Sequence, residues 1–136
     1  MCNLELMSIQ HKHSYLIHFQ YLGFRLHGWQ KQDKVKTVQG IVEKTLRFIL
    51  GDVKFRTLTS SRTDAMVSAN KSAFQLVIRK EIEPSWLLDE LKLNLPGDIR
   101  ILGVEIPPEK FNIIQAAESK EYHYLFTNGE AAHPFC

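Results

Sequence analysis

Hydrophobic and polar residues alternate along several stretches of the chain, as they do in half-buried β-strands. Residues 14–20 place Tyr15, Ile17 and Phe19 on one side of a strand and polar residues between them. Residues 53–59 and 73–79 alternate in the same way, and residues 99–106 and 118–127 also have the character of strands. The pattern therefore predicts five strands, the last of which carries Tyr122, Tyr124 and Phe126 on one face.

Two further stretches repeat apolar residues at helical spacing. The first follows Thr37, which is placed to cap a helix, and ends at Gly51. The second follows Ser85 and ends near residues 94–97. The order β-α-β-β-α-β-β predicts an α+β, ferredoxin-like split βαβ fold, with helices on one face of a mostly antiparallel sheet. We expect residues 1–13 to form a tail and residues 14–136 to form one domain.

Composition narrows the class of protein. A chain of 136 residues with 44% apolar content is large enough for one buried core. A net charge of +2 permits nucleic-acid binding without requiring it. Cys2 and Cys136 form no CxxC pair, so we expect neither a metal site nor a disulfide framework, and a cytoplasmic location. No apolar run reaches the roughly 18 residues of a membrane span.

The most informative polar segment lies between two predicted strands and reads Ser60-Ser61-Arg62-Thr63-Asp64-Ala65. Catalytic groups often occupy surface loops of this kind. A guanidinium at Arg62 would hold the Asp64 carboxyl ionised, which makes it available as a nucleophile or base. From local chemistry alone, the commoner explanation of such a pair is a surface salt bridge.

This segment resembles the signature of the tRNA pseudouridine synthase A family, in which the aspartate of Arg-Thr-Asp is catalytic. Four further stretches match that family in the same order: Tyr21-Leu22-Gly23 with Gly28-Trp29-Gln30, Thr37-Val38-Gln39-Gly40 with Glu43 and Leu46, Asn94-Leu95-Pro96-Gly97-Asp98-Ile99, and Lys120-Glu121-Tyr122-His123-Tyr124. The chain departs from the family pattern at two places. Met66 and Ser68 replace the usual Gly and His, and residues 111–114 replace the usual Phe-His-Ala-Arg.

The resemblance implies an isomerase that converts uridine to pseudouridine in the anticodon stem-loop of tRNA. Asp64 would attack ribose C1′ or uracil C6, and the sequence leaves both open. Tyr122 would stack on the base and take part in proton transfer. Arg62 would fill the space left by the flipped-out uridine and pair with Asp64. Because the reaction involves no redox or phosphoryl transfer, we expect no cofactor and no metal.

The predicted loop at residues 21–36 interleaves cations with aromatic residues, which suits phosphate contacts and base stacking. We predict RNA contacts by Arg25, Trp29, Gln30, Lys31, Lys34 and Lys36. Trp29 has a second possible role as a loop anchor packed on the core. Each of the cations could instead be an ordinary solvated side chain.

Two other functions stay open. A non-catalytic RNA-binding module is one, although the chain has no RNP-type aromatic strand. A metal-dependent nuclease is the other, and it would need several clustered carboxylates, whereas only Asp64 has a suitable setting. Members of the resembled family carry a second, similar half that closes the active-site cleft. We therefore expect this chain to be the N-terminal half of a homodimeric tRNA enzyme with no membrane partner, and to be inactive alone.

Overall fold

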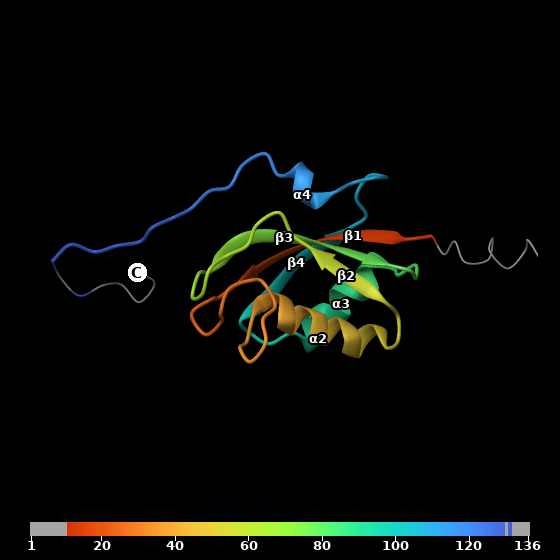
Figure 1. Ribbon diagram of the computed structural model, residues 1–136, viewed down its shortest axis with the longest axis horizontal. Helices are drawn as coiled ribbons and strands as arrows, with labels where there is room; N and C mark the ends of the chain where they lie inside the picture. Colours follow the sequence, from red (N-terminus) through yellow and green to blue (C-terminus); the bar gives the residue numbers. More distant parts are fainter. Residues whose placement is uncertain (1–10, 130, 132–136) are drawn as a thin grey trace, which may run out of the picture.

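A four-stranded antiparallel sheet forms the centre of the computed structural model, which describes residues 11–129 and residue 131. Its strands are β1 (His13–Tyr21), β2 (Phe55–Leu58), β3 (Ala69–Ile78) and β4 (Ile99–Glu105), in the spatial order β2-β3-β1-β4. Helices α2 (Val38–Leu50) and α3 (Pro84–Asn94) cover one face of this sheet (Figure 1). The predicted α+β, split βαβ arrangement is confirmed.

The core lies between the sheet and the two helices. Alternate residues of β1 and β3 point into it, including Ile17, Phe19, Phe74 and Leu76, none of which has measurable exposure. The helices contribute Val42, Leu46, Leu87 and Leu91, which are equally buried. Burial of each such side chain stabilises the fold by about 1.5–3 kcal/mol, so this layer supplies the rigid support for the loops at its ends.

The ends of α2 are those that the sequence predicts. The Thr37 hydroxyl accepts a hydrogen bond of 3.2 Å from the Gly40 amide, and the Gly51 amide donates to the carbonyl of Arg47. Helix α3 differs, because its N-cap is Glu83 and not the predicted Ser85. Pro84 occupies the first turn, where its fixed φ and missing N–H are suited to a helix start.

The fifth predicted strand, at residues 118–127, is absent from the described structure. After β4 the chain crosses the sheet face opposite α2 and α3, forms the short helix α4 (Ile113–Ala116), and then extends away from the body (Figure 1). We call residues 117–129 the C-terminal segment. Its alternating aromatic residues remain exposed, with Tyr124 and Phe126 both at 85%. Alternation alone does not make a strand, because the backbone also needs a partner strand, and none of the four pairs with this segment.

A buried glutamine holds the start of α4 on the sheet. The Gln75 side-chain amide donates to the Phe111 carbonyl at 3.1 Å and accepts from the Ile113 amide at 3.0 Å. The segment that departs from the family pattern therefore covers part of the face opposite the main helices. Among the helices in residues 11–129, none has the length and apolar character to cross a membrane.

Candidate active site

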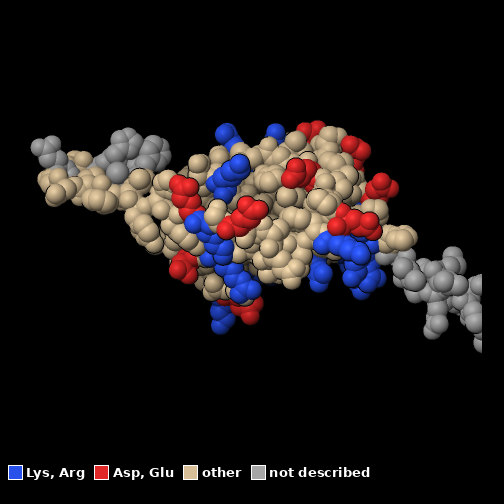
Figure 2. Space-filling model, turned by 90° about the horizontal axis from the view of Figure 1, so that it is seen from above, with Lys and Arg blue, Asp and Glu red and all other residues tan. Residues whose placement is uncertain are grey.

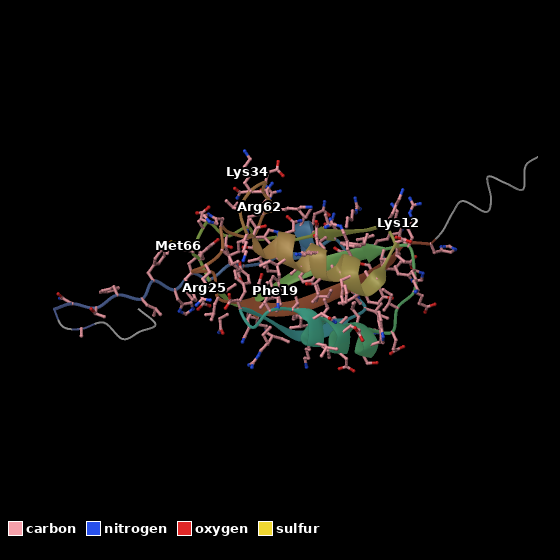
Figure 3. The ribbon with its side chains drawn as sticks, turned by 90° about the horizontal axis from the view of Figure 1, so that it is seen from below. Lys12, Phe19, Arg25, Lys34, Arg62 and Met66 are labelled. Carbon is pink, nitrogen blue, oxygen red and sulfur yellow. The ribbon has the colours of Figure 1, made fainter. Side chains whose placement is uncertain are left out.

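Asp64 lies in the connection between β2 and β3, which we call the Asp64 loop (residues 59–68). It packs against the connection between β1 and α2, which we call the Trp29 loop (residues 22–36). Figure 3 shows Arg25, Lys34, Arg62 and Met66 gathered at one end of the domain, whereas Lys12 lies at the other. The candidate site is therefore built by two loops at one end of the sheet.

Hydrogen bonds join the two loops along their length. The Trp29 amide donates to the Thr63 carbonyl at 3.2 Å, and the Met66 amide donates to the Leu26 carbonyl at 2.9 Å. The Gly23 amide donates to the Ser68 hydroxyl at 2.9 Å, so the serine that departs from the family pattern has a structural contact here. These bonds hold the Asp64 loop on both sides of its aspartate.

Two glycines of the Trp29 loop permit this close approach. Gly28 has a φ of 79°, and a Cβ atom at that position would lie 2.4 Å from the Thr63 carbonyl oxygen. A Cβ atom at Gly23 would lie 1.9 Å from the carbonyl oxygen of Val67. Both distances are far below van der Waals contact, so a side chain at either position would push the loops apart.

Trp29 anchors its loop to the core. Its side chain is only 3% exposed, and its ring lies 5.5 Å from the ring of Phe19 and 5.9 Å from that of Phe74. Because the Trp29 ring is buried in the core, it is not exposed for the predicted RNA contact. The alternative role as a loop anchor is the observed one.

Tyr21 also reaches the Asp64 loop from the sheet. Its side chain is 4% exposed, and its hydroxyl shares a hydrogen bond of 2.7 Å with the hydroxyl of Thr63. Burial raises the pKa of the Tyr21 hydroxyl, so it remains protonated at neutral pH. The residue preceding Asp64 is thus held by its carbonyl and by its side chain.

Arg62 bonds to Gln30 and not to Asp64. Its guanidinium donates to the Gln30 side-chain carbonyl at 3.0 Å, and none of the ion pairs among the described residues includes Asp64. The predicted Arg62–Asp64 pair is not formed, because Gln30, positioned next to Trp29, offers its oxygen to Arg62 instead. The same finding removes the simple salt-bridge explanation within the described residues, among which the exposed Asp64 carboxylate has no counter-ion.

Helix α2 braces the site from the other side. The Gln39 side chain accepts from the Lys31 amide at 3.0 Å and donates to the Thr57 hydroxyl at 3.1 Å. That hydroxyl donates to the Glu43 carboxylate at 3.0 Å. The network ties the Trp29 loop to α2 and to β2, the strand that leads into the Asp64 loop, and gives Gln39 and Glu43 a physical role.

The predicted phosphate-binding cations differ in their surroundings. The Lys31 ammonium lies 3.5 Å from the Glu43 carboxylate, and the Arg25 guanidinium lies over the ring of Phe24 at 5.0 Å. Lys34 and Lys36 are exposed and form no ion pair with a described residue. Figure 2, which views the molecule from the side of α4, shows Lys and Arg in separate groups among scattered acidic residues.

Comparison with known proteins identifies the family. A sequence profile described as tRNA pseudouridine synthase matches residues 17–114, which is well over half of the chain. The chain belongs to the tRNA pseudouridine synthase family. The matched region runs from β1 into α4 and includes both loops of the candidate site.

Similar curated proteins carry the name tRNA pseudouridine synthase A. The protein of Aquifex aeolicus is 33% identical over 123 residues, which covers 90% of this chain and 50% of that protein. The protein of Thermosipho africanus is 35% identical over 118 residues, covering 85% and 48%. That of Coxiella burnetii is 36% identical over 113 residues, covering 82% and 42%. The chain spans about half the length of the curated relatives it matches.

Tyr122, the third predicted catalytic residue, lies in the C-terminal segment, outside the region that the tRNA pseudouridine synthase profile matches. Its side chain is 61% exposed and makes no hydrogen bond or ring contact within the described residues. Asp64 and Arg62 thus lie in one loop without pairing, and no contact within the described residues joins Tyr122 to either of them. The role of Tyr122 stays a prediction.

The sequence predicted no individual roles for the residues whose side chains connect the tRNA pseudouridine synthase motifs in the structure. Tyr21, Thr63, Gln39 and Glu43 act through hydrogen bonds between elements that are distant along the chain. One signal was present for Tyr21, because it continues the alternation of Tyr15, Ile17 and Phe19 into the core. A buried tyrosine hydroxyl needs a partner, and this one finds it beside Asp64.

Proposed function

We propose that Asp64 is the nucleophile of a tRNA pseudouridine synthase. One observation carries the proposal: Asp64, at the catalytic position of the family's Arg-Thr-Asp motif, is an exposed carboxylate that pairs with no described cation and lies on a firmly held loop. An unpaired carboxylate on a rigid support is suited to attack a carbon of a bound nucleotide.

The proposed reaction rearranges one nucleoside without an added reactant. The bond between ribose C1′ and uracil N1 breaks, and a bond between C1′ and C5 forms. The proton on C5 leaves, and N1 gains a proton, so atoms and electrons balance. The Asp64 carboxylate attacks C1′ or C6 during this exchange. The uridine must leave its stack to reach the loop, and Arg62, two residues before Asp64, would fill the space that the uridine leaves.

The exposure of Asp64 indicates that another wall completes the pocket. A reacting uracil must be enclosed and shielded from water, and an exposed loop alone does not provide this. We expect the wall to come from outside the described residues, so the described domain alone should not convert uridine. The motif resemblance supports the anticodon stem-loop of tRNA as the substrate, a homodimeric assembly and a cytoplasmic location.

Phosphate contacts are proposed for Arg25, Lys34 and Lys36 of the Trp29 loop. They are exposed at the end of the domain that carries Asp64, and no described carboxylate pairs with them. Lys31 pairs with Glu43, and Gln30 holds Arg62. We therefore expect Lys31 and Gln30 to contribute less to RNA affinity than the sequence predicted.

Release of tritium from tRNA labelled at uridine C5 tests the proposal. The protein expressed from its complete gene should release tritium to water, because C5 loses its proton only when the new bond forms. Asp64→Ala should lower the rate by more than about 10³-fold while leaving tRNA affinity nearly unchanged. Asp52→Ala, an exposed carboxylate after α2, is the matched control and should keep full activity. Tritium release by Asp64→Ala at the wild-type rate would exclude the assignment, and tRNA binding without release by any variant would favour a non-catalytic RNA-binding module.

A further inference from the structure

Two buried tyrosines lie on the same face of β1 and bond to different parts of the molecule. Tyr15 is 1% exposed, and its hydroxyl donates to the Ile82 carbonyl at 2.7 Å and accepts from the Ile82 amide. Tyr21 is 4% exposed, and its hydroxyl bonds to Thr63 at 2.7 Å. Burial raises the pKa of both hydroxyls. One tyrosine therefore fixes the connection before α3, and the other fixes the residue before Asp64.

The Tyr21 side chain is itself well fixed. Its ring stacks on that of Phe19 at 5.5 Å, and its backbone pairs with Ala69, the first residue of β3 after the Asp64 loop. A register shift lies between Phe19 and Tyr21, and such irregularities re-aim side chains at the ends of strands. A short path of contacts thus runs from the sheet through Tyr21 and Thr63 to the backbone of Asp64.

We propose that Tyr21 is a positioning residue, whose hydroxyl fixes Thr63 and thereby sets the place of the Asp64 carboxylate relative to the reacting uridine. The inference rests on the proposed function and assigns this residue a part in it. A misplacement of catalytic groups by about 1 Å can cost on the order of 100-fold in rate. Loss of the hydrogen bond between Tyr21 and Thr63, next to the nucleophile, would allow a displacement of about this size.

Kinetics of four variants test this role in the protein expressed from its complete gene. Tyr21→Phe and Thr63→Val each remove one hydroxyl and retain most of the shape of the side chain. Each should lower kcat for tritium release roughly 10- to 100-fold, with KM for tRNA unchanged. The double variant should be no slower than either single variant, because both remove the same bond. Thr63→Ser, which keeps the hydroxyl, should retain most of the wild-type kcat.

Tyr15→Phe is the matched control, since it removes a buried hydroxyl from the same strand at the other end of the sheet. It should lower the thermal midpoint without changing kcat. A wild-type kcat for Tyr21→Phe, multiplying effects in the double variant, or an equal loss of kcat in Tyr15→Phe would each overturn the positioning role. If Tyr21→Phe does not fold, the contrast between Thr63→Val and Thr63→Ser decides the question. A wild-type protein that releases no tritium would overturn the proposed function and this inference with it.

Discussion

The Asp64 loop and the C-terminal segment both carry residues for which the sequence predicts a catalytic role, yet their surroundings in the fold differ. The Asp64 loop is bonded to the Trp29 loop through Thr63, Met66 and Ser68, and two glycines allow the backbones to approach. Tyr122 in the C-terminal segment has no such contact within the described residues. A motif therefore identifies a residue, but only contacts with the body of the protein place it.

The largest expected effect on the Asp64 loop comes from replacing Gly28 by alanine, with Gly51 as the comparison. Gly28 and Gly51 both have positive φ, at 79° and 66°, so alanine costs about 1–2 kcal/mol of backbone strain at either position. At Gly28 the new Cβ atom would also meet the Thr63 carbonyl, whereas at Gly51 no atom of the described residues lies within 4 Å of it. We expect Gly28→Ala to lower the free energy of unfolding by about 1–3 kcal/mol more than Gly51→Ala does.

Urea unfolding of the two glycine variants measures this difference directly. Only Gly28→Ala should also lower the rate of tritium release, because it displaces the loop that carries Asp64. Equal losses of stability at the two positions would mean that the Trp29 loop does not brace the Asp64 loop as closely as described.

A smaller effect is expected from the outward-facing cations of the Trp29 loop. Replacing Lys34 and Lys36 by alanine should weaken binding to all tRNAs and flatten the slope of log affinity against log salt by roughly one unit per lost phosphate contact. Lys92, an exposed lysine on α3, is the matched control and should leave the slope unchanged. An unchanged slope in the Lys34 and Lys36 variants would mean that the Trp29 loop has only a structural role.

Sequence patterns predicted the parts of the fold that depend on local order. The alternation in residues 14–20 predicted β1, and Thr37 and Gly51 predicted the ends of α2, because strand periodicity and helix capping act over a few residues. The predicted strand at residues 118–127 failed since a strand also needs a partner, which alternation does not supply. Helix α4 was not foreseen, because Gln75, 38 residues before Ile113, holds its first turn.

The candidate site was predictable in its chemistry and less so in its geometry. The motif resemblance selected Asp64 and Arg62, and the structure places both in one exposed loop. It did not reveal that Gln30 holds Arg62 or that Trp29 packs on Phe19. These contacts join residues from separate elements, and a single sequence carries no sign of which distant side chains meet.

Hydrogen exchange of individual backbone amides tests the contrast between the two regions most directly. The amides of Trp29 and Met66 donate to carbonyls of the facing loop, whereas no described backbone hydrogen bond comes from residues 118–126. We predict strong protection for Trp29 and Met66, and exchange at the rate of a free peptide for residues 118–126. Exchange of Trp29 and Met66 as fast as that of residues 118–126 would contradict the claim that the fold holds Asp64 in place.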